Sequence, residues 1–148
     1  MRLFRTALAI TCTALTALAL AGCGRAIVEY IPEGGTYTLA KVQERAVTVD
    51  ARGAERIATD DAYEERVDRL VYLRRQGEEA AAVADALTSG FPTENASVPI
   101  LVERGTVDGQ PVWIVVEAWG EPGAKTEHRR LWLLDGQTLD VVNSSSFR

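Results

Sequence analysis

Two cysteines and one histidine are the side chains whose chemistry would be most telling in this sequence. Cys12 and Cys23 could form a disulfide, and together with His128 they could supply ligands to a metal ion. A tetrahedral zinc site of the Cys/His type needs four such ligands, whereas the 148-residue chain has three of these side chains. We therefore expect no zinc site of this type, and the role of the cysteines depends on the segment around them.

The first 22 residues have the organisation of a secretory signal peptide. Arg2 and Arg5 come first, and residues 6–22 carry no charge and are rich in alanine and leucine. A positively charged start, a short apolar run and small residues at its end are typical of a leader that is cleaved off. The run is also too short to span a bilayer comfortably as a helix. Because cleavage would separate Cys12 from Cys23, we expect no disulfide between them.

The end of this leader, Leu20-Ala21-Gly22-Cys23, resembles the lipobox of bacterial lipoproteins. The resemblance implies cleavage between Gly22 and Cys23, diacylglyceryl transfer to the Cys23 sulfur, and acylation of the new amino terminus with a chain such as palmitate. Two or three acyl chains attach a protein durably to a membrane, whereas one does so only marginally. The expected location is the cell envelope. Gly24 replaces the aspartate that resembles an inner-membrane retention signal, which favours the periplasmic side of the outer membrane in a host with two membranes.

Length and charge bound the mature protein. Removal of the leader leaves 126 residues, enough for one domain with a modest core. These residues include 14 basic and 21 acidic side chains, a formal net charge of −7, so binding of nucleic acid or anionic lipid through a basic patch is not expected. We assign residues 23–35 to a lipidated tether, which Pro32, Gly34 and Gly35 punctuate, and residues 36–148 to a single domain.

The first half of the domain predicts short strands followed by helix. The stretches TYTLA (36–40) and RAVTVDA (45–51) are rich in Thr, Val and Tyr, which is typical of strands. A helix is expected after Thr59, and Gly77 favours its division into two helices or a strong kink. Gly90 and Pro92 are expected to end the helical segment. Its buried face is predicted to be an apolar or small stripe at steps of three and four residues: Tyr63, Val67, Leu70, Leu73, Gly77, Ala80, Ala84 and Leu87.

From Val98 onward the apolar residues alternate with a period of two. Asp108-Gly109 separates two such runs and supplies the positive φ angles that a type I′ hairpin turn needs. The stretches HRRLWLLD (128–135) and LDVVNSS (139–145) are expected to form a third and a last strand. The sequence therefore predicts an α+β fold, with one or two helices followed by an antiparallel β-meander of three to four strands. A helix is expected to pack on one face of the sheet.

The second strand of this hairpin is apolar on both faces. One face is predicted to hold Val112, Ile114, Val116 and Ala118, and the other Trp113, Val115, Glu117 and Trp119. One face should meet the helix, and the other must be covered by the segment from Ile27 to Val49 or by a partner. Internal cover is favoured, because the early strands must pack somewhere. If uncovered, the second face would be a protein-binding surface of Trp113, Val115, Trp119 and Trp132.

No set of residues amounts to a catalytic signature. His128 is flanked by Glu127, Arg129 and Arg130, but a general base needs partners that position a nucleophile or water, and neighbouring strand residues point to opposite faces. We expect His128 to be a solvated residue at the start of a strand. The adjacent acidic pairs, such as Glu78-Glu79, diverge by about 100° on a helix and are not expected to bind one metal ion.

The region from residue 77 to residue 143 resembles two families. Gly77, Val83, Leu87 and Pro92, followed by the strands, look like the layout of small lipoproteins that serve the outer-membrane β-barrel assembly machinery. The stretch LWLLDGQTLDVV (131–142) is similar to the third strand and turn of PepSY domains. Both resemblances imply a helix followed by a meander, and neither implies catalytic residues or a cofactor.

Three functions remain open at this stage. The first is a non-enzymatic envelope lipoprotein, anchored to a membrane through Cys23, that binds another envelope protein or serves in assembly. The second is a module that binds a small apolar ligand or a cell-wall fragment. The third, more remote, is a hydrolase that uses His128. No cofactor, metal ion or nucleic-acid partner is expected for the first function.

Overall fold

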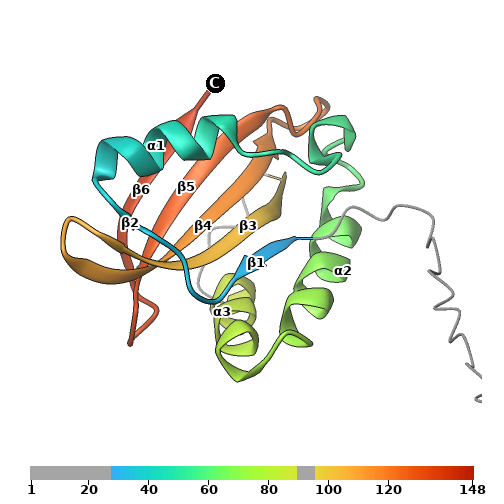
Figure 1. Ribbon diagram of the computed structural model, residues 1–148. Helices are drawn as coiled ribbons and strands as arrows, with labels where there is room; N and C mark the ends of the chain where they lie inside the picture. The colour runs from blue at the N-terminus through green and yellow to red at the C-terminus, as the bar shows by residue number, and fades with distance from the viewer. Residues whose placement is uncertain (1–27, 90–95) are drawn as a thin grey trace, which may run out of the picture.

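The computed structural model describes residues 28–89 and 96–148. Within these ranges the chain forms three α-helices, one 3₁₀ helix and a six-stranded sheet (Figure 1). The helices are α1 (Leu39–Thr48), η1 (Ala54–Arg56, the 3₁₀ helix), α2 (Ala62–Arg74) and α3 (Glu78–Ser89). The strands are β1 (Glu29–Ile31), β2 (Thr36–Tyr37), β3 (Ala96–Val107), β4 (Gln110–Gly120), β5 (His128–Asp135) and β6 (Val141–Phe147).

The sheet is an antiparallel meander of β3, β4, β5 and β6 with two short parallel strands at one edge. β1 and β2 both pair with β3, at residues 101–103 and 106–107 respectively, so the strand order is β1-β3-β4-β5-β6. The predicted α+β class and the meander are confirmed. Residues 28–35, which we assigned to the tether, include Val28, which is buried, and β1, so the folded domain begins before residue 36.

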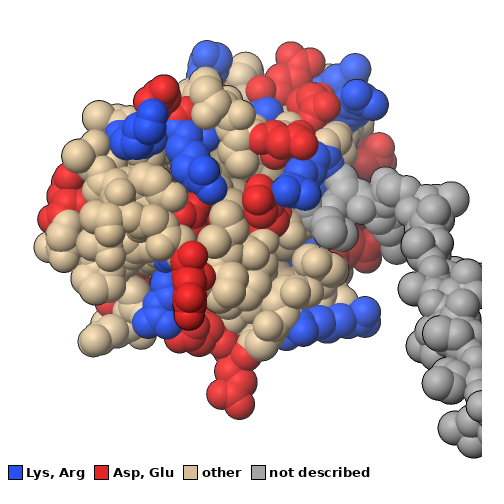
Figure 2. All heavy atoms as spheres, viewed as in Figure 1, with Lys and Arg blue, Asp and Glu red and all other residues tan. Residues whose placement is uncertain are grey.

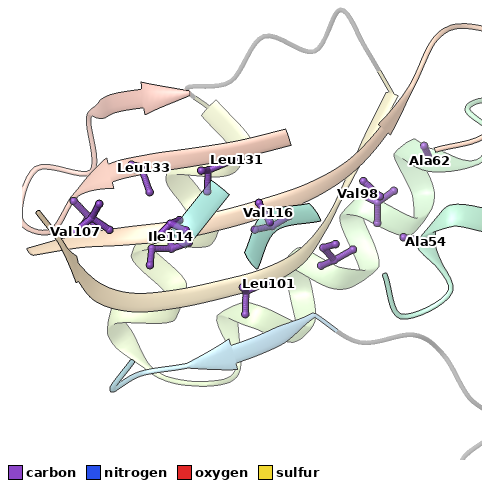
Figure 3. Packing of buried hydrophobic residues seen from close by; sticks show 14 residues of the cluster. Ala54, Ala62, Val98, Leu101, Val107, Ile114, Val116, Leu131 and Leu133 are labelled. Carbon is purple, nitrogen blue, oxygen red and sulfur yellow. The ribbon is translucent and has the colours of Figure 1, made fainter. Parts of the chain in front are cut away.

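Helices cover both faces of the sheet, which gives the domain three layers (Figure 1). We call the two sides the α1 face and the α2–α3 face. On the α1 face, a cluster joins Val42 and Ala46 of α1 to alternate residues of the central strands (Figure 3). On the other face, Leu73 of α2 and Val83 of α3 pack against Trp113 of β4. The helical hairpin, with Val28 and Tyr30, thus covers the tryptophan-bearing face, and α1 lies over the opposite one.

Helix α1 is where the sequence-based prediction fails. RAVTVDA (45–51) was expected to be a strand, but most of it completes α1. The side chain of Thr38 caps the helix by accepting a hydrogen bond from the Lys41 amide, and Val42 and Ala46 are buried one turn apart. The β-branched residues Val47 and Thr48 suggested a strand. The prediction failed because strand propensity is easily overridden by packing.

Gly77 separates α2 from α3, as predicted. Its φ of +141° lies in a region that residues with a Cβ rarely adopt, and the chain reverses direction there to form a helical hairpin. Three of the stripe residues, Tyr63, Val67 and Gly77, are nevertheless exposed, so the prediction that they are buried is wrong. The predicted end of the segment at Gly90 and Pro92 lies outside the described residues.

The predicted β-hairpin turn is confirmed. Asp108 and Gly109 have φ angles of +48° and +83°, the positive values that a two-residue type I′ turn requires. A second tight connection joins β5 to β6, where Asp135 Oδ1 accepts hydrogen bonds from the amides of Gln137 and Thr138. These two hydrogen bonds stabilise the ionised carboxylate and lower the pKa of Asp135.

The break at Gly77 yields the first testable prediction. Gly77→Ala should lower the free energy of unfolding by about 1–3 kcal/mol, because the backbone must keep a φ that alanine disfavours although a methyl group there meets no neighbour. Urea unfolding followed by tryptophan fluorescence would measure the change. The matched control is Ala82→Gly, at an exposed position of α3, which should lower the free energy of unfolding by about 1 kcal/mol through helix propensity alone. An unchanged midpoint for Gly77→Ala would contradict the strain argument.

Candidate functional site

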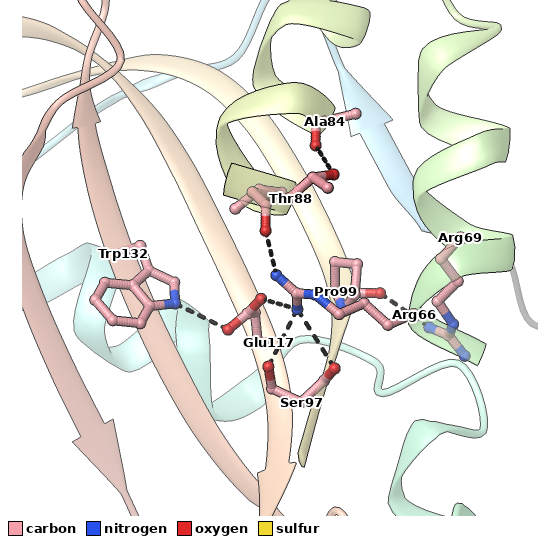
Figure 4. Close-up of polar contacts among 9 residues, drawn as sticks. Arg66, Arg69, Ala84, Thr88, Ser97, Pro99, Glu117 and Trp132 are labelled. Carbon is pink, nitrogen blue, oxygen red and sulfur yellow. Dashed lines mark hydrogen bonds and ion pairs between the residues drawn. The ribbon is translucent and has the colours of Figure 1, made fainter. Parts of the chain in front are cut away.

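A buried ion pair lies between α2 and the sheet on the α2–α3 face. Glu117 of β4, only 1% exposed, forms an ion pair with the Arg66 guanidinium of α2 (Figure 4). The same guanidinium donates hydrogen bonds to the Ser97 hydroxyl at 3.1 Å and, from its other nitrogen, to the Leu87 carbonyl at 2.8 Å. One arginine therefore connects α2 to both α3 and two strands of the sheet.

The tryptophans complete this network. Trp132 Nε1 donates a hydrogen bond of 2.9 Å to the second carboxylate oxygen of Glu117, so both oxygens of this buried group have partners (Figure 4). Trp119 Nε1 donates to the Arg129 carbonyl at 3.0 Å, and the Arg130 guanidinium lies 4.8 Å from the Trp119 ring centroid. These contacts satisfy the polar atoms of the indoles and stack a cation on one ring.

The predicted aromatic binding surface lies inside the protein. Its four residues are buried, with exposed fractions of 9% or less: Trp113, Val115, Trp119 and Trp132. Internal cover, the alternative favoured from the sequence, is what the structure shows. The helices α2 and α3 cover this face together with the early chain, where Val28 is buried in the same cluster and the Tyr30 ring stacks on Trp113 at a centroid distance of 6.3 Å. In this structure these residues offer no exposed aromatic patch to a partner.

A second buried glutamate occupies the opposite face. Glu103 of β3 is 1% exposed and forms an ion pair of 2.9 Å with Arg45 of α1. Its other oxygen accepts hydrogen bonds from the Tyr37 hydroxyl at 2.7 Å and the Gly35 amide at 3.2 Å. The hydrogen bond to Glu103, aided by burial, raises the pKa of Tyr37 above its usual value.

Arg69 is the most deeply buried cation among the described residues. It is 1% exposed, forms an ion pair with Glu65 at 2.7 Å, and donates hydrogen bonds to the carbonyls of Pro99 and Arg52. Arg69 thereby joins α2 to the start of β3 and to the loop that precedes η1. Because Arg66 and Arg69 occupy the inward side of α2, apolar residues of the same helix lie on its solvent-exposed side.

His128 lies at the first position of β5, as predicted, and is half-buried. Its ring packs against the Trp119 ring at a centroid distance of 5.0 Å, and the two residues are cross-strand partners. The packing positions the imidazole against a buried indole at the sheet end. His128 and Arg130 therefore both contact the Trp119 ring, with the imidazole tilted by 49° to the indole.

The outer side of α2 has the surface features most typical of a binding site. Three apolar side chains at four-residue spacing are 75%, 41% and 39% exposed: Tyr63, Val67 and Val71. Residues four apart lie on one side of a helix, so these form a continuous stripe. Beside it is a shallow groove of about 360 Å³ that is lined by Arg56, Ile57, Ala58, Asp61, Glu64, Glu65 and Asp68. We call the stripe and the groove together the α2 surface.

Sequence reasoning missed the α2 surface because the spacing of apolar residues on α2 fits two neighbouring faces of the helix. Both faces contain residues at steps of three and four, and Leu70 and Leu73 belong to the buried one. The signal that distinguishes them is the pair Arg66 and Arg69, which must face inward to meet the carboxylate of Glu117 and backbone carbonyls. A glutamate in an otherwise apolar strand indicates that a cation will face it.

Several predicted features lie outside the described residues. They include the leader, the cleavage position at Gly22 and the lipid-attachment residue Cys23.

In the described ranges no helix is long and apolar enough to cross a membrane, and no cluster of three or more His, Cys, Asp or Glu side chains could hold a metal ion. Acidic and basic side chains are interspersed over the face of the molecule that Figure 2 shows.

Comparison of the chain with known protein families, with curated proteins and with solved structures finds no match. The resemblances to outer-membrane assembly lipoproteins and to PepSY domains therefore stay predictions.

The Glu117–Arg66 ion pair yields a testable prediction. Arg66→Leu should lower the free energy of unfolding by about 3–5 kcal/mol, because it leaves the Glu117 carboxylate buried without a cation. The double variant Arg66→Leu/Glu117→Gln removes the buried charge and should recover a large part of this loss. Chemical denaturation of the three proteins measures both values. A double variant less stable than Arg66→Leu would show that the charge is not the cause.

Proposed function

We propose that this protein is a lipid-anchored component of the bacterial cell envelope whose α+β domain binds another protein without catalysing a reaction. The observation that supports the proposed lipid anchor is the lipobox-like Leu20-Ala21-Gly22-Cys23 at the end of a leader-like segment. The outer membrane, on its periplasmic side, is the proposed location in a host with two membranes. An acyl anchor on Cys23 would hold the domain at the bilayer without any membrane-spanning segment.

The short distance along the chain between anchor and domain supports a role close to the membrane. Val28 is buried in the α2–α3 cluster and follows Cys23 by five residues. Five residues span at most about 18 Å, so the domain would stay within that distance of the lipid headgroups. A partner would therefore be met next to the membrane and not across the periplasm.

The α2 surface is the proposed contact region for the partner. Its apolar stripe exposes Tyr63 and Val67, and tyrosine combines a large contact area with a polar group that can donate a hydrogen bond. The neighbouring groove contributes the carboxylates of Asp61 and Glu64. The complementary partner is a protein that offers an apolar ridge with basic side chains beside it.

The anchor is tested by metabolic labelling with an alkyne analogue of palmitate in bacteria that express the full chain. We expect label on the wild type and its loss, with retention of the uncleaved leader, for Cys23→Ser. Cys12→Ser is the matched control and should keep the label and the cleavage. Equal labelling of wild type and Cys23→Ser would remove the proposed anchor.

The contact region is tested by placing a photo-crosslinking residue at position 67 of the full chain in intact cells. We expect a discrete crosslinked protein, and Tyr63→Ser should reduce its yield several-fold, because it removes the largest exposed side chain of the stripe. The same crosslinker at Ala82, an exposed position of α3, is the control and should not capture that protein. Identical capture from both positions, or no effect of Tyr63→Ser, would exclude the α2 surface as the contact region.

A further inference from the structure

The two edges of the sheet differ in how well they are protected from pairing with another strand. At one edge, β1 and β2 have three and two residues, and Pro32 and Glu33 lie between them. At the other edge, β6 runs for seven residues, Val141 to Phe147, without a charge or a proline. In the described residues no strand pairs with the outer side of β6.

An open edge of this length is a template for strand addition. Every second residue of an edge strand turns its N–H and C=O groups away from the sheet, where they can pair with another strand. Natural proteins usually protect such edges with charged side chains, prolines or short strands, and β6 has none of these. The residues of β6 alternate between exposed and half-buried from Val142 onward, so the outer edge is accessible to a partner strand.

The sequence of this edge is complementary to itself. In an antiparallel pair of two copies centred on Ser144, each residue meets the one equally far on the other side of the centre. Four of the five facing pairs are matched in character: one is apolar, two are polar, and opposite charges meet at both ends; in the fifth, a valine faces a serine. The facing residues are Asp140 with Arg148, Val141 with Phe147, Val142 with Ser146, Asn143 with Ser145, and Ser144 with itself.

The surroundings of β6 favour the same arrangement. Asp140 is exposed, and Arg148 is 70% exposed and forms an ion pair with Glu121 at 3.0 Å. Such an exposed ion pair contributes little stability, so Arg148 can exchange Glu121 for Asp140 of a second copy. Val141 and Val142 are 46% and 51% exposed, and pairing would bury them. On the α1 face, Gln43 donates a hydrogen bond to the Ser145 hydroxyl at 3.2 Å. Val47, one turn further along α1, is 51% exposed on the same side of the helix.

We propose that two copies of this chain pair through β6, antiparallel and centred on Ser144, to form one continuous sheet across a two-fold axis. The axis passes through the sheet at Ser144 and is perpendicular to it, so α1 of each copy lies on the same side of the joined sheet. Membrane anchoring would concentrate the copies, but the pairing itself does not depend on it. The proposal goes beyond the proposed function, since α2 packs over β3 and does not take part.

The test uses the full chain in the membranes of an expressing bacterium, with Ser144→Cys and mild oxidation. We expect a disulfide-linked dimer on a non-reducing gel, because two copies of position 144 face each other at the centre of the proposed pair. Val142→Cys is the register control: its two copies would be four residues apart, about 13 Å, and should crosslink poorly. Glu64→Cys, exposed on α2, controls for random collision, and the unsubstituted chain controls for Cys12 and Cys23.

Charge reversal tests the ends of the pair independently of the crosslink position. In the Ser144→Cys background, Arg148→Asp should lower the dimer yield about threefold to tenfold at low salt, because it faces Asp140 of the other copy. Adding Asp140→Arg to the same chain restores opposite charges and should restore the yield. Equal crosslinking at positions 144, 142 and 64, or no recovery in the double reversal, would overturn the proposal.

Discussion

The burial of β4 on both faces is the constraint on which the rest of the domain depends. Every residue of β4 from Val112 to Gly120 is buried, so both sides of the central strand must be covered. A sheet covered on one side would expose either the aliphatic residues or the tryptophans of this strand. The chain meets the requirement by placing α1, which precedes the meander in the sequence, on one face and the α2–α3 hairpin on the other. Three layers in so small a domain follow from the composition of one strand.

Each layer is joined to the sheet by an ion pair as well as by apolar packing. Glu103 faces α1 and pairs with Arg45, and Glu117 faces α2 and pairs with Arg66. Apolar contacts alone would permit a helix to slide or rotate by a turn at small cost, whereas an unpaired buried carboxylate is strongly unfavourable. The two glutamates therefore specify which turn of each helix lies over which strand. We expect their contribution to be to the uniqueness of the packing more than to its net stability.

The parts of the fold that could be predicted are those determined by local chemistry. The turn at Asp108-Gly109 and the break at Gly77 follow from backbone conformations that few other residues adopt, and the alternation in β3 to β5 follows from the period of the strands. Helix α1 was predicted wrongly because its apolar contacts are made with strands that come more than fifty residues later. The exposed stripe on α2 was missed for a similar reason, since the inward orientation of Arg66 depends on the distant Glu117.

The burial of both faces also limits how this domain can meet other proteins. Because helices cover the two sides of the central sheet, its faces are closed to a partner, and side chains on the outside of a helix or the backbone at a sheet edge can make contact instead. The two proposed contacts would differ in recognition: the α2 surface would select a partner by shape and charge, whereas β6 would select it by strand register. α2 packs against β3, and β4 and β5 separate β3 from β6, so the two regions are about 15 Å apart across the sheet. The proposed pairing through β6 therefore uses none of the residues of the α2 surface, and a paired sheet would keep two such surfaces, one on each copy.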